Sequence, residues 1–149
     1  LATGALAQTL ANAIGACSLK TCGYALSTDP LKTHALELAK EGRMLVDLHG
    51  MTSFHGCDIC VGRGVAPSEN TLELIDSLLR AGELLGLKIA VDKPFAGTSR
   101  HALTRIVQEN RAEALQIELS PECRKPIEQS TKTILALTLF LEVFGFYSN

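Results

Sequence analysis

The sequence predicts an α/β fold, with helices on both faces of a mostly parallel sheet of about four strands. Segments with apolar residues at helical spacing alternate along the chain with short apolar runs that are typical of buried strands. This alternation is the signature of helices packed on both faces of a mostly parallel sheet. The chain has 149 residues, 46% of them hydrophobic, and is therefore long enough to bury a core as a single domain over residues 1–149.

The first part of the chain predicts two helices and two strands. Residues 5–16 are rich in alanine and carry apolar residues at helical spacing, which predicts a helix. Residues 19–25 mix Thr, Cys, Tyr and Leu and are interpreted as a strand. At residues 27–30 a capping group precedes a proline, which indicates the start of a helix over 31–41. Residues 43–49 follow as an apolar strand.

The second part of the chain continues the alternation after a long loop. Residues 50–67 are polar and rich in glycine, and loops of this length in compact domains are often functional. Helical spacing predicts the helices that follow, and short apolar runs after glycine or charged residues predict the strands. In order, the elements are a helix over 68–85, a strand over 87–91, a helix over 101–110, a strand over 114–119 and a helix over 126–144.

Composition narrows the function classes. The net charge is −2 without a basic block, which argues against nucleic-acid binding. The apolar run 134–147 is too short for a bilayer span, and residues 1–16 lack the basic start of a signal peptide. Five cysteines are an odd number and suggest free thiols in a reducing compartment, which predicts a cytoplasmic location. The first residue is Leu, so we expect a processed, trimmed or incompletely represented chain.

The strand over 43–49 ends in polar residues that suit a functional edge. Asp47 and His49 are two residues apart, so both point to the same face of the strand. Ligands of open α/β sheets bind outside the carboxyl ends of the strands, which makes His49 a candidate metal or catalytic position. The alternative is a capped strand end with a hydrogen-bonded histidine, and this stretch alone does not separate the two.

Two further strand ends carry polar side chains. They are Asp92 with Lys93, and Gln116 with Glu118. If the sheet is parallel, these ends share one edge with His49. A histidine and a glutamate at such an edge are half of a hydrolytic zinc site, in which the metal acidifies a bound water and the glutamate accepts its proton.

Four arginines lie in or near the adjoining loops and are candidates to bind a substrate carboxylate. A guanidinium group binds a carboxylate through two parallel hydrogen bonds. The alternative for each arginine is a solvated surface charge. The candidates are Arg63, Arg100, Arg105 and Arg124.

The segment His55-Gly-Cys57-Asp-Ile-Cys60 allows two interpretations. A Cys-x-x-Cys pair beside a histidine can bind structural zinc, for which His49 could serve as a fourth ligand. No second Cys-x-x-Cys pair is present, so free thiols are the default interpretation. The other cysteines are predicted to be small core residues, namely Cys17, Cys22 and Cys123.

Four short motifs stand in order along the chain. They are residues 46–51 (VDLHGM), 58–62 (DICVG), 93–97 (KPFAG) and 115–120 (LQIELS). Their order and spacing resemble the N-formylglutamate amidohydrolase-like proteins, relatives of the zinc carboxypeptidases and succinylglutamate desuccinylases. The resemblance runs from about the first helix to the last strand, and its most telling parts are the strand ends in the first and last motifs.

The resemblance implies a three-layer α/β/α sandwich of the phosphorylase/hydrolase type. It implies zinc as cofactor with His49 as a ligand, and Glu118 as the catalytic residue that activates water. It also implies that Arg124 meets a substrate carboxylate. Arg100 and Arg63 remain further candidates for substrate binding because they lie in or near the adjoining loops. The expected reaction is hydrolysis of the amide of an N-acylated acidic amino acid or a similar small molecule.

In the family that the chain resembles, an earlier histidine and an acidic ligand complete the zinc site, and here they would precede Leu1. His34 and Glu37 have His-x-x-Glu spacing but fall within an amphipathic helix, and we interpret them as a surface face. The chain is then either a fragment of a longer hydrolase domain, inactive on its own, or a degenerate member that has lost catalysis. Two other functions stay open: a non-catalytic module for small carboxylated ligands, and a protein with a structural metal at Cys57 and Cys60.

The expected partner is a small-molecule substrate, with neither nucleic acid nor membrane. If an N-terminal segment is missing, an exposed strand edge or apolar patch would favour association into a homo-oligomer.

Overall fold

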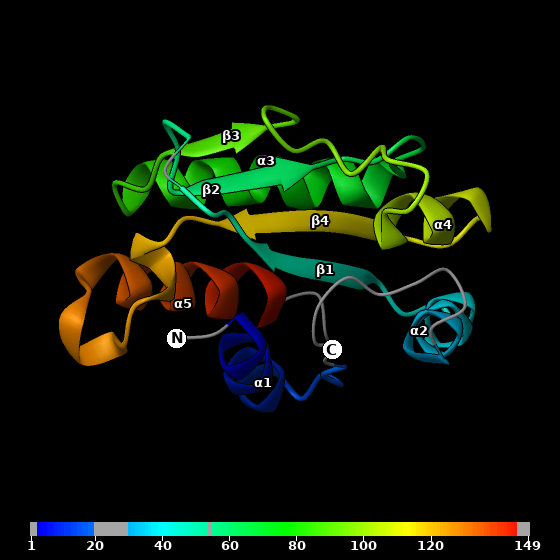
Figure 1. The fold of residues 1–149 in the computed structure, drawn as a ribbon, viewed down its shortest axis with the longest axis horizontal. Coiled ribbons are helices and arrows are strands. Elements are labelled where there is room, and N and C mark those ends of the chain that lie inside the picture. Colours follow the sequence, from blue (N-terminus) through cyan, green and yellow to red (C-terminus); the bar gives the residue numbers. More distant parts are fainter. Residues whose placement is uncertain (1–2, 20–29, 54, 146–149) are drawn as a thin grey trace.

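A computed structural model describes residues 3–19, 30–53 and 55–145, in which four strands form one sheet. The strands are β1 (Leu45–Gly50), β2 (Ile59–Gly62), β3 (Ile89–Val91) and β4 (Ala114–Leu119). Their order across the sheet is β1-β4-β2-β3 (Figure 1). The α-helices are α1 (Thr3–Ile14), α2 (Pro30–Lys40), α3 (Glu69–Leu84), α4 (Leu103–Glu109) and α5 (Thr131–Gly145).

Helices cover both faces of the sheet, which confirms the predicted α/β/α sandwich. One face carries Ile59, Leu115 and Ile117 and forms the main core with residues of α1, α3 and α5. In Figure 1, α3 runs behind β2 and β3. On the other face Ala114 packs against Ala39 of α2 and Val107 of α4. A second cluster on that face joins Met51, Cys57 and Cys60.

The sheet is mostly parallel, but it contains one reversal. Strand β1 pairs parallel with β4, and β2 pairs parallel with β3, whereas β2 and β4 are antiparallel. The carboxyl ends of β2 and β3 therefore lie at the edge opposite to those of β1 and β4. The expectation that three polar strand ends share one edge is thus wrong for Asp92 and Lys93, which follow β3.

The reversal comes from a strand that the sequence did not reveal. Residues 50–67 were expected to be one long loop, but β2 lies within them. All four of its residues are buried, so they show no alternation of apolar and polar side chains. Its last residue is Gly62, where a Cβ atom would lie 2.7 Å from the carbonyl carbon of Ala96. Only glycine allows this close approach of two backbones.

Burial also distinguishes the two strands that carry the candidate site. Every residue of β4 is buried, whereas β1 is a half-buried edge strand whose Val46 is 36% exposed. The fully buried strand of this pair is therefore β4, rather than β1 as its apolar run suggested.

The helices lie close to their predicted ranges. The predicted start at Ser68 is confirmed, because its hydroxyl oxygen accepts a hydrogen bond of 3.1 Å from the Thr71 backbone N–H. The last helix begins five residues later than predicted, at Thr131, after the 3₁₀ helices η1 (Glu122–Arg124) and η2 (Ile127–Gln129). The strand predicted over 19–25 lies, except for its first residue, outside the described residues. Within the described ranges no helix has the length and apolar character needed to cross a membrane.

Candidate active site

The carboxyl ends of β1 and β4 bring the main candidates together. In the parallel pairing of these strands, His49 lies opposite Glu118, and Asp47 lies opposite Gln116. Side chains alternate along a strand, so all four point to the same face of the sheet. The predicted neighbourhood of a histidine and a glutamate at one strand edge is therefore present.

Each of the two central side chains is held by a neighbour from its own strand. The His49 Nε2 atom lies 2.9 Å from Asp47 Oδ1, and the Gln116 side-chain N–H donates to Glu118 Oε1 at 2.9 Å. The Asp47 and His49 side chains are 16% and 49% exposed, whereas Glu118 is 8% exposed. The site thus pairs a solvent-facing imidazole with a nearly buried carboxyl group.

These surroundings shift the pKa values of both groups upwards. The hydrogen bond with the Asp47 carboxylate raises the pKa of His49, with a smaller contribution from the negative charge of Glu118. Burial raises the pKa of Glu118 above its ordinary value, although the positive charges of His49 and Arg124 act in the other direction. A carboxyl group whose pKa is raised toward neutrality is better suited to accept a proton from water.

Arg124 is the predicted substrate-binding arginine that the structure places at this edge. Its Nη2 donates to the carbonyl oxygen of Met51, and its Nε donates to that of Leu119 at 3.3 Å. At Gly50 a Cβ atom would lie 2.6 Å from Arg124 Nε, so the guanidinium group crosses the strand end where no side chain intervenes. A positive charge is thereby fixed beside Glu118.

The other predicted arginines lie elsewhere. Arg63 follows β2 at the opposite edge, where its Nε and Nη2 both lie 2.6 Å from Asp92 Oδ2. Arg100 is exposed, and its Nε donates to His101 Nε2 at 2.9 Å. Arg105 lies on α4 and forms an ion pair of 2.7 Å with Glu109. None of these three is held in the network of His49 and Glu118.

The cysteine segment has the features of core residues. Cys57 and Cys60 are buried free thiols, as the default interpretation predicted, and burial raises the pKa of both. A raised thiol pKa makes a cysteine less reactive. His55 is exposed and contacts the Phe95 ring edge-on, with ring centroids 5.4 Å apart.

The remaining sequence candidates have mixed outcomes. Cys123 is buried, as predicted for a core residue, but Cys17 is exposed, so that prediction is wrong for Cys17. The sequence around each of the two cysteines does not distinguish them, and the difference comes from packing, because Cys123 belongs to the main core cluster and Cys17 does not. Cys22 lies outside the described residues. His34 and Glu37 form an exposed pair at 3.6 Å, which confirms their interpretation as a surface face.

The residues that the structure describes do not form a complete zinc site. Within residues 3–19, 30–53 and 55–145 no group of three His, Cys, Asp or Glu side chains is arranged to hold a metal ion. The His49 Nε2 atom is already within hydrogen-bond distance of Asp47. The His49 imidazole, the ligand expected from the sequence, therefore does not belong to a three-ligand set among the described residues.

A pocket of about 260 Å³ lies on the same face of the sheet, and the sequence did not predict it. It is lined by residues 94–99, Ala102 and Gln116. The sequence showed residues 93–97 only as a motif after the strand over 87–91, and the position of this segment over Gln116 depends on the antiparallel pairing of β2. Gln116 connects this pocket to the cluster of His49 and Glu118, because it lines the pocket and its side-chain N–H donates to Glu118.

Comparisons with known proteins show what this fold resembles. The structure is similar to bacteriophage poly-γ-glutamate hydrolase, with a TM-score of 0.57 and 16% identity over 98% of this chain and 78% of that chain. It also matches N-formylglutamate amidohydrolase from Ralstonia eutropha JMP134, with a TM-score of 0.49 and 19% identity over 69% of this chain. That match spans 42% of the amidohydrolase, less than half of its length. No family model and no curated protein matches the chain.

At these identities the likeness is one of fold. The phage hydrolase aligns with nearly the whole chain, so the α/β/α arrangement around β1 and β4 is shared with a solved hydrolase structure. The resemblance to the N-formylglutamate amidohydrolase-like proteins is therefore supported at the level of a fold relation, and a shared fold does not by itself determine the chemistry.

The Asp47→Asn variant is expected to lower the pKa of His49, because the Asp47 hydrogen bond is the largest cause of its upward shift. A pKa raised by folding stabilises the folded chain fully below the unfolded value of about 6.5, and this contribution is lost as the pH rises through the folded value. Titration of the histidine ring protons by NMR measures the shift. Asp76→Asn, which removes an exposed carboxylate on α3, is the matched control. An unchanged His49 titration in Asp47→Asn would contradict this account.

Proposed function

We propose that this chain is an amidohydrolase that cleaves the carbon–nitrogen bond of an N-acylated acidic amino acid or a similar small carboxylated amide. The observation that carries the proposal is the direct register of His49 opposite Glu118, with Arg124 fixed at the same edge. Both similar structures are named as hydrolases of glutamate-containing molecules, which supports the same substrate class.

In the proposed reaction Glu118 is the general base. Its buried carboxylate accepts a proton from a water molecule that attacks the amide carbonyl carbon, and the proton then passes to the leaving nitrogen. His49, oriented by Asp47, lies beside this position and can donate a hydrogen bond to the oxygen that gains negative charge. The charge of Arg124 attracts the substrate carboxylate toward this edge.

To test the proposal, the purified chain is incubated with a defined set of amides and the free amine that is released is measured. The set contains N-formyl-, N-acetyl- and N-succinyl-L-glutamate and a γ-glutamyl dipeptide. For each amide, the counterpart with leucine in place of glutamate is the apolar control. We expect release from at least one glutamate amide and a clear preference over its leucine counterpart. No release from any glutamate amide, with and without added zinc, would refute the function.

Zinc remains part of this proposal as a cofactor. His49 would supply one imidazole ligand through the ring nitrogen that Asp47 does not hold, in place of its hydrogen bond to the substrate oxygen. Additional ligands would have to come from outside the residues that the structure describes. A bound zinc ion would supply Lewis acidity toward the carbonyl oxygen and a more acidic water.

The His49→Ala variant is expected to bind less zinc than the wild-type chain, because it loses the imidazole of the proposed set. Elemental analysis after dialysis against zinc measures this content, and His34→Ala removes an exposed surface histidine as the matched control. Equal zinc content in wild-type chain and His49→Ala would exclude His49 as a ligand.

A non-catalytic binding module is the second candidate. It is favoured by the pocket that residues 94–99, Ala102 and Gln116 line. Such a module would bind N-acyl-glutamates without releasing amine, so the same set of amides separates the two functions. A structural metal at Cys57 and Cys60 has less support, since His55 beside them is exposed and packs on Phe95. A cytoplasmic location and association through an exposed strand edge or apolar patch stay predictions.

A further inference from the structure

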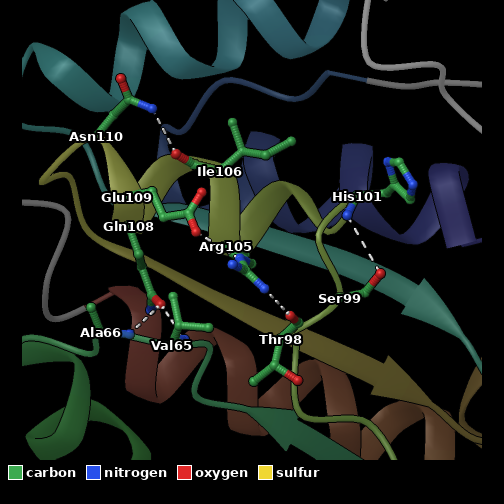
Figure 2. Close-up of polar contacts among 10 residues, drawn as sticks. All are labelled: Val65, Ala66, Thr98, Ser99, His101, Arg105, Ile106, Gln108, Glu109 and Asn110. Carbon is green, nitrogen blue, oxygen red and sulfur yellow. Dashed lines mark hydrogen bonds and ion pairs between the residues drawn. The ribbon is translucent and has the colours of Figure 1, made fainter.

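The pocket beside Glu118 has walls that are fixed by backbone contacts. The loop over residues 94–99 approaches β2 at Gly62, and its Ala96 carbonyl oxygen accepts a hydrogen bond of 2.8 Å from the Gly64 backbone N–H. On the far side Arg105 Nη1 donates to the Thr98 carbonyl oxygen at 3.1 Å (Figure 2). The loop is therefore held at both ends of the pocket, as expected for a preformed binding site.

Gln116 joins this pocket to the proposed general base. Its side-chain N–H donates to Glu118 Oε1, and a carboxylate can only accept hydrogen bonds. The amide oxygen of Gln116 must therefore face the other way, toward Gly97. A Cβ atom on Gly97 would lie 3.4 Å from that oxygen, which places the oxygen on the pocket side.

The amide oxygen of Gln116 is available as an acceptor. Among the described residues no hydrogen bond is found to this oxygen, whereas the side-chain N–H of Gln116 donates to Glu118 Oε1. Gly97 has a φ of 70° and lacks a side chain, so the space next to this oxygen stays open. The pocket thus presents an unpaired acceptor one side chain away from the base.

We propose that Gln116 is a positioning and specificity residue whose Oε1 accepts the N–H of the scissile amide while its own N–H holds Glu118. This inference rests on the proposed amide hydrolysis and names the substrate class more narrowly. The chain acts on amides that carry an N–H and rejects those whose nitrogen is alkylated. Thr98, Ser99 and Phe95 are among the other residues that line the pocket, whose size suits a small substrate.

The kinetic test compares N-formyl-L-glutamate with its N-methyl counterpart. A site built around a substrate N–H strongly disfavours an analogue that lacks it, so we expect kcat/KM to fall about 100-fold or more on N-methylation. In Gln116→Met, which can neither donate nor accept in this way, the ratio of the two kcat/KM values should shrink to roughly threefold, within the range of a small steric effect. Gln129→Met is the matched control, because Gln129 is exposed, and it should keep the wild-type ratio. An unchanged ratio in Gln116→Met would show a purely steric effect and overturn the inference.

A binding readout keeps this test independent of turnover. N-methylacetamide and N,N-dimethylacetamide are added to the wild-type chain, and NMR follows the backbone signals of Gly97, Thr98 and Ser99 and the side-chain amide of Gln116. We expect the N–H amide to shift these signals and the dimethyl amide to leave them unchanged at equal concentration. Equal shifts, or none with either probe, would overturn the inference even if glutamate amides are hydrolysed. Selective shifts without any hydrolysis would support the acceptor role and refute the proposed function instead.

Discussion

The Gln108→Leu variant is expected to lower the free energy of unfolding by about 2–4 kcal/mol, a large loss for one side chain. Gln108 is 5% exposed, and its amide pairs with four backbone groups, of which those of Val65 and Ala66 are drawn in Figure 2. Its oxygen accepts from the N–H groups of Val65 and Ala66 at 2.8 and 2.9 Å. Its nitrogen donates to the carbonyl oxygens of Arg63 and Ala114 at 2.7 and 2.9 Å.

The size of this effect follows from what the leucine leaves behind. The buried hydrogen bond to the Ala114 carbonyl oxygen of β4 would be lost, together with three part-buried ones to backbone groups of the loop after β2. Each group that is left unpaired and buried carries a desolvation cost. Urea unfolding followed by circular dichroism measures the loss. Gln129→Leu, an exposed glutamine changed in the same way, should stay within about 0.5 kcal/mol of wild type. A loss of that small size in Gln108→Leu would mean that the amide does not hold the loop.

The Glu118→Gln variant should lose about two or more orders of magnitude in turnover of glutamate amides, because an amide cannot accept the proton of the attacking water. The change is nearly isosteric, and Glu118 lies on the central strand β4 opposite His49. Its partner Gln116 can still form a hydrogen bond to the new side chain. We therefore expect a folded protein with an unchanged melting profile and a loss confined to catalysis.

Steady-state rates of amine release measure the loss in Glu118→Gln. Glu73→Gln is the matched control, since it removes an exposed carboxylate from α3, which packs on the other face of the sheet. Turnover at the control level in Glu118→Gln would remove Glu118 from the mechanism.

Most of the fold was predictable because its helices and longer strands carry strong local patterns. The apolar spacing in α3 and the capping hydroxyl of Ser68 are local signals, and the structure reproduces both. Strand β2 was not predictable in this way, since its four buried residues have no period and sit among glycines. Because β2 pairs antiparallel with β4, both β2 and β3 run in the direction opposite to β4, and Asp92 lies at the other edge of the sheet from His49 and Glu118.

The candidate site shows the same division between local and tertiary information. The facing direction of Asp47 and His49 follows from the two-residue repeat of a strand and could be predicted. The opposition of His49 and Glu118 depends on the register between strands that are far apart in sequence. The pocket over Gln116 needed the close approach of Gly62 to the loop after β3, which no local pattern encodes.

The arginines illustrate why residue type alone did not identify binding residues. All four candidates lie in or near loops, yet Arg63 is bound by Asp92 and Arg105 by Glu109 and the Thr98 carbonyl. Arg124 reaches the site because Gly50 leaves room for its guanidinium group across the strand end. Backbone geometry, rather than charge, separates it from the others.

Incorporation of ¹⁸O from labelled water into the acid product measures whether Glu118 activates water beside His49. Mass spectrometry follows the acetate released from N-acetyl-L-glutamate, or the acid from whichever amide of the set is cleaved. We expect one solvent oxygen in each acid molecule from the wild-type chain and a roughly 100-fold slower appearance of label with Glu118→Gln. Release of unlabelled acid, or equal labelling rates in the two proteins, would contradict this role of Glu118.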